Sequence, residues 1–308
     1  MTDKKSLFSD IALLLVTMVW GLSFPLIRNA LSTVSDTGYV FYRFLIAAVC
    51  VFPFLVIYRK KITKDLLKSG VLLGFMLFLV IFLTVTSLRV TSAVNVSFFT
   101  GASVALVPLL SVLIYKIKIT KFQILSSVIS ILGILLLIGN LSLDFSFGNL
   151  AGVILAICVA SQLLVTDNQA KKGDALILGF LQIFICSFFS SAYYIANGAP
   201  KVELNSSVII ALLVTGVLST AVAFTIQVVA QKYTTPLKTA LIFSCEPVFG
   251  ALFSAMIPKS DGSLEHLTMS QVLGCLLILI AIFISDEVIF SNIKKMQRFY
   301  PKPEPKNE

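Results

Sequence analysis

The sequence has little of what most catalytic and nucleotide-binding sites need. It holds one histidine, His266, in 308 residues, and only 13% of its residues are charged, against about 25% in soluble domains. A single histidine outside the apolar segments leaves almost no material for a metal site or a Ser-His triad. No G-x-x-x-x-G-K-[ST] motif occurs, so a P-loop that would couple the protein to ATP is excluded. We expect no metal and no cofactor.

The five cysteines give no paired arrangement either. They all fall in apolar segments, and no C-x-x-C spacing occurs; they are Cys50, Cys158, Cys186, Cys245 and Cys275. Disulfides and zinc binding are therefore not expected.

Hydrophobic residues are abundant instead. They make up 57% of the chain and include 25 Phe, and the mean hydropathy is +0.98. Apolar runs recur at roughly the 20-residue length that carries a helix across a bilayer. They do not alternate as β-barrel strands do. The sequence predicts an all-α integral membrane protein with ten transmembrane helices, at about 10–30, 38–58, 69–88, 93–115, 121–140, 148–166, 175–196, 208–230, 237–257 and 270–290.

Basic residues predict the orientation of these helices. With the N-terminus inside, 19 of the 24 Lys and Arg fall in cytoplasmic segments, and one, Arg43, lies inside the second helix. The outer segments hold Arg28, Arg89, Lys201 and Lys259. Because cytoplasmic loops are enriched in Lys and Arg, we expect a multi-pass protein of the cytoplasmic membrane with both termini cytoplasmic. The net charge of +9 then suits an anionic inner leaflet rather than nucleic acid.

An internal repeat is visible in three landmarks that recur in the same order, 139 to 148 residues apart. A basic and hydroxyl-rich segment ("SLRVTSA", later "AQKYTTP") precedes an apolar run, a proline lies inside that run, and a T-x-x-Q motif opens the next. The prolines are Pro108 and Pro247, and the motifs are Thr120 to Gln123 and Thr268 to Gln271.

These landmarks divide the chain into two five-helix repeats, 8–145 and 146–292, followed by a polar cytoplasmic tail, 293–308. Five is an odd number, so the second repeat must enter the membrane upside down relative to the first. Inverted repeats are a common design of secondary transporters, which rock two halves about a site near the midplane.

Several motifs resemble the EamA family of the drug/metabolite transporter superfamily. They are Trp20-Gly21-x-Ser23-Phe24 in the first helix, Arg43 within "FYRF", Glu246-Pro247-Val248-Phe249 in the ninth helix, and "EHLTMSQVLGCLLIL" at 265–279. The resemblance covers nearly the whole chain. It implies ten helices in two EamA repeats and the export of small metabolites.

Charged residues inside apolar helices are the first site candidates, because a central charge costs roughly 2.5–3.5 kcal/mol on insertion. Arg43 and Glu246 are the main two. For Arg43 the alternatives are an interfacial position reached by snorkelling and a gate or anion contact in the cavity, paired with an acidic or carbonyl partner. For Glu246 they are a structural hydrogen bond beside Pro247 and a cavity carboxylate that binds a cation or a proton.

Weaker candidates come from depth and helical spacing. Trp20 lies too deep for an interfacial belt, and polar and aromatic residues at i, i+4 and i+7 form stripes that line a wet path or hold helices together. The predicted substrate pathway comprises Trp20, Arg43, Asn95, Phe99, Gln162, Gln182, Phe224, Gln227 and Glu246. The predicted hinges are Pro25, Pro108 and Pro247, since proline bends helices.

The sequence thus favours a permease, with no enzymatic activity, that exports a small metabolite such as an amino acid or a drug-like compound by alternating access. Its partners would be the solute, the lipid bilayer and, in one alternative, a coupled proton. A channel or scaffold is the first alternative and a lipid-modifying membrane enzyme the second. The residues specify neither the solute, the transport direction, the coupling ion nor the oligomeric state.

Overall fold

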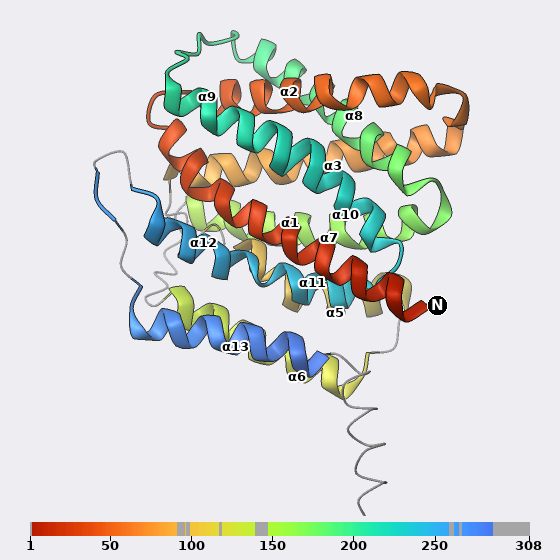
Figure 1. Ribbon diagram of the computed structural model, residues 1–308, viewed down its shortest axis with the longest axis vertical. Coiled ribbons are helices and arrows are strands. Elements are labelled where there is room, and N and C mark those ends of the chain that lie inside the picture. Colours follow the sequence, from red (N-terminus) through yellow and green to blue (C-terminus); the bar gives the residue numbers. More distant parts are fainter. Residues whose placement is uncertain are drawn as a thin grey trace, which may run out of the picture.

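The computed structural model describes residues 2–90, 96, 99–116, 119–138, 147–258, 262–264 and 267–285, and within these ranges the chain is helical with no strand (Figure 1). The elements are α1 (Thr2–Ala30), α2 (Asp36–Ile57), the 3₁₀ turn η1 (Arg59–Lys61), α3 (Lys64–Val90), α5 (Ser103–Tyr115), α6 (Lys121–Ile138), α7 (Phe147–Lys172), α8 (Ala175–Ala196), α9 (Ser206–Leu213), the π-helix η2 (Val214–Val222), α10 (Ala223–Gln231), α11 (Pro236–Phe243), α12 (Glu246–Met256) and α13 (Met269–Ser285).

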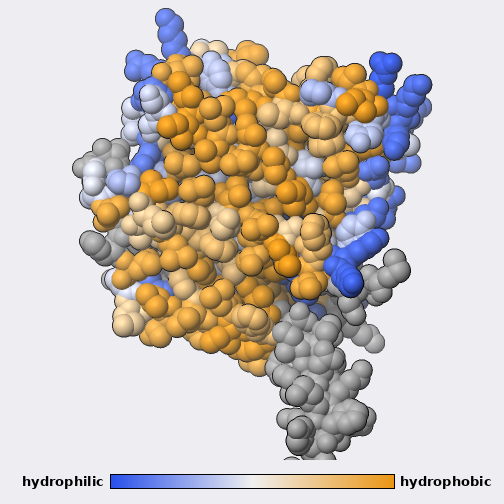
Figure 2. All heavy atoms as spheres, viewed as in Figure 1, coloured by the Kyte–Doolittle hydropathy of each residue, from blue (hydrophilic) through white to orange (hydrophobic). Residues whose placement is uncertain are grey.

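Helix length and apolar composition fit a bilayer. Among the described residues, seven helices are long and apolar enough to cross a membrane, and three shorter apolar helices lie at 99–115, 121–136 and 269–284. Figure 2 shows that the visible face is almost wholly hydrophobic, while hydrophilic residues gather at the two edges where the helices end. A soluble protein buries such side chains, so this exterior is that of a protein surrounded by lipid.

The sequence marks where several helices begin. At the start of α2, Ser35 Oγ accepts a hydrogen bond from the backbone N–H of Gly38. This bond pairs a backbone donor that has no partner within the helix. The two T-x-x-Q motifs form reciprocal capping boxes: Thr120 N donates to Gln123 Oε1 (2.9 Å), and Thr268 N donates to the amide oxygen of the matching glutamine (2.8 Å). These boxes begin α6 and α13.

Two of the predicted spans are not regular helices. The span predicted at 208–230 contains the nine-residue π-helix η2. The span predicted at 237–257 is broken at Ser244 and Cys245, and Pro247 lies in the first turn of α12. Pro247 therefore lies just after a break in the predicted span, and its role as a hinge stays a prediction. Because a proline lacks an amide hydrogen, it fits a first turn, where that hydrogen has no helical partner.

The other predicted prolines lie inside helices. Pro25 is within α1 and Pro108 within α5. Of the predicted span 93–115, residues 93–95, 97 and 98 lie outside the described residues.

Two hydrophobic cores hold the bundle together. The first includes Tyr39, Phe44 and Leu73, from α2 and α3, and continues into α8 and α10. The second includes Leu13 and Ile134 and runs through α5, α7, α11, α12 and α13. The ring of Trp20 packs against both clusters. The segment of α1 around Trp20 therefore lies where the two cores meet.

Gly21 lets α1 cross α12 at close range. A Cβ at this position would lie 2.5 Å from the Cβ of Phe249 and 2.8 Å from the amide nitrogen of Gly250. A backbone atom at that distance cannot move without shifting α12. We expect Gly21→Val to lower the free energy of unfolding by about 1–3 kcal/mol, seen as a lower thermal unfolding midpoint in detergent.

The matched control for this prediction is Met18→Val. It introduces the same β-branched side chain in α1 at a position that is 37% exposed, so it should leave the midpoint close to that of the wild type. Equal midpoints for Gly21→Val and the wild type would contradict the close crossing.

Candidate functional site

A narrow cavity lies between the two cores. It encloses about 60 Å³ accessible to water, which is room for a few water molecules and well below the 300–1,000 Å³ of typical small-molecule pockets. Its lining combines aromatic, amide, hydroxyl and charged groups with aliphatic ones, and comprises Trp20, Ser23, Phe24, Ile27, Arg43, Val80, Ile81, Thr84, Thr100, Val159, Gln162, Leu163, Ser219, Phe224, Gln227, Phe243 and Glu246.

Arg43 projects from α2 into this cavity and is only 2% exposed. Its Nε donates to Thr220 Oγ1 (2.8 Å) and its Nη2 donates to Ser219 Oγ (3.2 Å). No ion pair joins it to a carboxylate within the described part of the chain. Arg43 thus lies inside the bundle, and its side-chain partners are neutral hydroxyls rather than an acidic or carbonyl group. A buried guanidinium held by hydroxyls keeps its positive charge unneutralised.

The π-helix η2 supplies those hydroxyls. Gly216 allows η2 to approach α2 closely, because a Cβ there would lie 3.0 Å from the Cβ of Ile46. On the same segment Thr220 Oγ1 donates to the carbonyl of Thr215 (2.7 Å), five residues earlier. This geometry aims the Thr220 oxygen at Arg43. Single-turn π-bulges often occur at functional sites, and here the wider helix positions the groups that hold the arginine.

An aromatic wall closes one side of the cavity. The Trp20 ring centroid lies 4.9 Å from that of Phe224 and 5.0 Å from that of Phe243. The indole Nε1 donates to the carbonyl of Ser219 (3.0 Å), and Ser23 Oγ lies 2.9 Å from the Ser219 hydroxyl. This wall offers apolar surface and fixes α1 against η2, so it suits the apolar part of a solute.

Glu246 is the second ionisable residue of the cavity lining. It is the first residue of α12 and is 9% exposed. No hydrogen bond or ion pair reaches its carboxyl group from the residues that the structure describes. Because this buried carboxyl group has no partner among those residues, it is left available to a cation or a proton.

Two amide side chains of the lining also have spare hydrogen-bonding capacity. Gln162 Nε2, from α7, and Gln227 Oε1, from α10, are buried and have no hydrogen-bond partner within the described ranges. Because a buried polar atom without a partner is costly, these two atoms offer a donor and an acceptor to a polar solute.

Of the nine residues predicted for the substrate pathway, six line this one cavity: Trp20, Arg43, Gln162, Phe224, Gln227 and Glu246. Gln182 does not; it is fully buried and its Nε2 donates to the carbonyl of Phe224 (3.4 Å). Phe99 packs closely on Gly152, away from the lining. Asn95 lies outside the described residues. The role of the six in transport stays a prediction.

The predicted pathway did not include four hydroxyl residues of the lining, Ser23, Thr84, Thr100 and Ser219. Ser219 directly precedes Thr220, whose Oγ1 accepts the hydrogen bond from Arg43 Nε. A neighbouring pair of hydroxyls in an otherwise apolar run was the available signal, and both of these hydroxyls accept hydrogen bonds from Arg43. Thr84 bonds the carbonyl of Val80 in its own helix, so nothing in its spacing distinguishes it.

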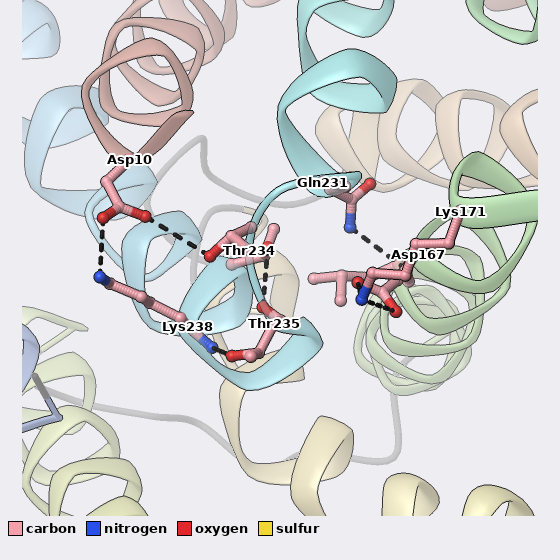
Figure 3. A network of polar contacts seen from close by, with 9 residues as sticks. Asp10, Asp167, Lys171, Gln231, Thr234, Thr235 and Lys238 are labelled. Atoms are coloured by element: carbon pink, nitrogen blue, oxygen red, sulfur yellow. Dashed lines mark hydrogen bonds and ion pairs between the residues drawn. The ribbon is translucent and has the colours of Figure 1, made fainter. Parts of the chain in front are cut away.

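A polar network closes the bundle near the N-terminal end of α1 (Figure 3). The carboxylate of Asp10 forms an ion pair with Lys238 Nζ (2.7 Å) and accepts a hydrogen bond from Thr234 Oγ1 (3.4 Å). These contacts join α1 to α11. Gln231, one turn beyond Gln227 of the cavity, donates to the carbonyl of Leu163 on α7 (3.2 Å). Contacts at this end of the bundle therefore tie α1 to α11 and α10 to α7.

Breaking the Asp10–Lys238 ion pair is expected to loosen this end. A partly exposed pair contributes about 0.2–1 kcal/mol, so Lys238→Gln should raise hydrogen–deuterium exchange of residues 232–240 by up to about fivefold. The charge swap Asp10→Lys with Lys238→Asp should restore the wild-type rate. Unchanged exchange in Lys238→Gln would show that the pair does not hold the helices together.

Comparison with known proteins identifies the chain. Residues 7–139 and 146–285 match the EamA-like transporter family. The chain belongs to this family. It is 31% identical over 280 residues to an uncharacterized transporter of Archaeoglobus fulgidus, covering 91% of this chain and 86% of the relative. The uncharacterized transporter YoaV of Bacillus subtilis is 24% identical over 284 residues, covering 88% and 94%.

A solved crystal structure shares the fold of this EamA-like chain. It superposes with a TM-score of 0.72 at 14% sequence identity, and the match covers 92% of this chain and 97% of the other. Together with the apolar helices, the family assignment makes the protein a multi-pass membrane transporter.

Proposed function

We propose that this EamA-like protein is a secondary transporter that exports a small amphipathic metabolite with both an acidic and a basic group, such as an amino acid. The observation that carries the proposal is the charge pattern of the cavity. Arg43 and Glu246 line the same small space, and within the described residues neither has a partner of opposite charge. Arg43 would bind the solute carboxylate, Glu246 its ammonium group, and the aromatic wall its apolar part.

The packing of the helices supports alternating access by two five-helix repeats. If each element of the first repeat is matched with its counterpart in the second, α1 corresponds to α7, α2 to α8 and α6 to α13. In the same way, α3 corresponds to the segment from α9 to α10, and α5 to the segment from α11 to α12. Under this exchange each main helix–helix contact is replaced by another contact that the structure also has. The α3–α8 contact corresponds to α2–η2, α3–α7 corresponds to α1–α10, and α1–α12 corresponds to α5–α7. This exchange of contacts supports two repeats related by a pseudo-two-fold axis, as in inverted-repeat transporters.

The narrowness of the cavity fits a closed state of this cycle. With about 60 Å³ of water-accessible space, the cavity must widen to admit a metabolite. The polar network at Asp10 and Lys238 closes one end, and we infer that its opening gives access to the cytoplasm.

Flux into proteoliposomes tests the function. The purified protein is supplied with a panel of amino acids and lipophilic cations, with and without a pH gradient. Saturable flux of a zwitterion supports the proposal. Non-saturable flux would favour a channel, and chemical conversion of a solute without flux would favour an enzyme. Faster flux of lipophilic cations than of amino acids would contradict the proposal that Arg43 binds the carboxylate of the solute.

Orientation has its own test. If both termini are cytoplasmic, reporter fusions after Lys60 and after Lys306 should read as inside and a fusion near Lys201 as outside. The basis is the split of 19 basic residues to four, counted from the sequence. A cytoplasmic location of the fusion near Lys201 would contradict the predicted inverted repeats.

A further inference from the structure

A second hollow lies on the outer face of the bundle, in the seam between α1 and α10, which run side by side in Figure 1. We call it the α1–α10 groove. It has a volume of about 820 Å³, and most of its lining is aliphatic or aromatic, including Leu15 and Val19 of α1, Leu218 of η2 and Val229 of α10. The surrounding face is hydrophobic (Figure 2). An open apolar groove of this size on a membrane protein takes up hydrocarbon.

One end of the groove is basic. Lys4 and Lys5 belong to its lining, and Lys5 Nζ lies 5.4 Å from the centroid of the Tyr233 ring. Among the described residues that line the groove, none is acidic. The charge is thus confined to the end where α1 begins, while the rest of the groove is apolar. This distribution complements an amphiphile with an anionic head.

The length of the groove matches a lipid in one leaflet. From Lys4 to Val19, α1 rises about 22 Å at 1.5 Å per residue. One leaflet contributes about 15 Å of hydrocarbon, so the groove extends from headgroup level through the depth of a leaflet. A single acyl chain can lie along it with its phosphate beside the two lysines.

The groove and the cavity share a wall. Val19 and Leu218 line the groove, while the next residues in sequence, Trp20 and Ser219, line the cavity and are joined by the indole hydrogen bond of 3.0 Å. An occupant of the groove therefore presses on the same helix contact that encloses the cavity.

We propose that the α1–α10 groove is a binding site for one anionic phospholipid, with an acyl chain between α1 and α10 and the phosphate held by Lys4 and Lys5. The site is separate from the solute cavity and does not depend on which solute is transported. The acyl chain gains van der Waals contacts with the groove wall, and the two lysines select the headgroup, since each contributes about 1 kcal/mol near an anionic surface.

The test is lipid binding to the purified full-length protein by native mass spectrometry, with phosphatidylglycerol and phosphatidylcholine titrated separately. The wild type should prefer phosphatidylglycerol. Lys4→Gln with Lys5→Gln should weaken phosphatidylglycerol binding by about 30-fold and leave phosphatidylcholine binding unchanged. The control, Lys60→Gln with Lys61→Gln, removes the same charge at exposed positions of η1 and should bind both lipids as the wild type does.

A second variant tests the apolar part of the site. Ala12→Phe fills the groove and should reduce binding of both lipids, while Leu14→Phe, on the same helix but outside the lining, should not. Wild-type affinity for phosphatidylglycerol in the double-lysine variant, or equal wild-type affinity for the two lipids, would overturn the headgroup assignment. Undiminished binding in Ala12→Phe would overturn the groove itself.

Discussion

Replacing Arg43 with Gln is expected to reduce kcat/KM for solute flux by about 100-fold or more. Losing one partner of a buried charged contact costs about 2–5 kcal/mol, and among the described residues of the cavity lining only Arg43 is cationic. The kcat/KM of Arg43→Lys should lie between those of the wild type and Arg43→Gln. An ammonium keeps the positive charge but lacks the planar guanidinium that binds a carboxylate through two hydrogen bonds. Initial rates in proteoliposomes measure the effect.

A solute analogue distinguishes binding by Arg43 from a purely structural role. The wild type should transport an amino acid far better than its amide, which lacks the carboxylate, whereas Arg43→Gln should transport both equally poorly. Arg89→Gln is the control: Arg89 lies 3.5 Å from Asp36 and is 41% exposed, so its removal should change flux by less than about threefold. Retained discrimination between acid and amide in Arg43→Gln would assign the carboxylate to another group.

Glu246→Gln is expected to remove the pH dependence of transport while the protein inserts and folds normally. Gln keeps the volume and the hydrogen-bonding capacity of the side chain but cannot release a proton. If Glu246 exchanges a proton or a cation with the cavity, solute flux driven by a pH gradient should be about tenfold or more lower in Glu246→Gln. The flux that remains should not change with pH. Arg43 is the other ionisable group of the lining and stays charged throughout, so it contributes no titration.

The control for Glu246 is Asp167→Asn. Asp167 is also nearly buried, but it is paired with Lys171 (2.8 Å) and does not line the cavity, so its variant should keep the pH profile of the wild type. Glu246→Leu tests the alternative in which Glu246 makes a structural hydrogen bond. In that case Glu246→Leu should be less stable than the wild type, while Glu246→Gln should keep wild-type stability and transport. A normal pH profile in Glu246→Gln would eliminate coupling through this residue.

Much of the fold and part of the site follow from the sequence because lipid imposes strict rules. Apolar runs near 20 residues in length have few alternatives to helices, and the T-x-x-Q motifs encode caps that form wherever a helix begins. Arg43 and Glu246 stand out because charge inside an apolar run demands a wet or polar surrounding. The hydrophobic pattern therefore located both residues without tertiary information.

What the sequence did not reveal depends on contacts between distant helices. The π-helix at 214–222 forms where η2 packs closely on α2 at Gly216, and no local pattern signals it. Gln182 has the same polarity as Gln162, yet Gln162 faces the cavity and Gln182 bonds the backbone of α10. Helical periodicity gives the face of a residue relative to its own helix only, so it cannot tell which neighbour that face meets.

The partners of Arg43 also impose an order in time. Thr220 lies 177 residues further along the chain, and at about 5–20 residues per second its synthesis follows that of Arg43 by roughly 9–35 s. During this interval α2 carries a cation with none of its final hydrogen bonds. The strongly apolar residues around it, such as the run from Phe44 to Val51, must hold the helix in the bilayer alone. The arginine thus becomes a permanent part of the membrane interior only when the second half of the protein arrives.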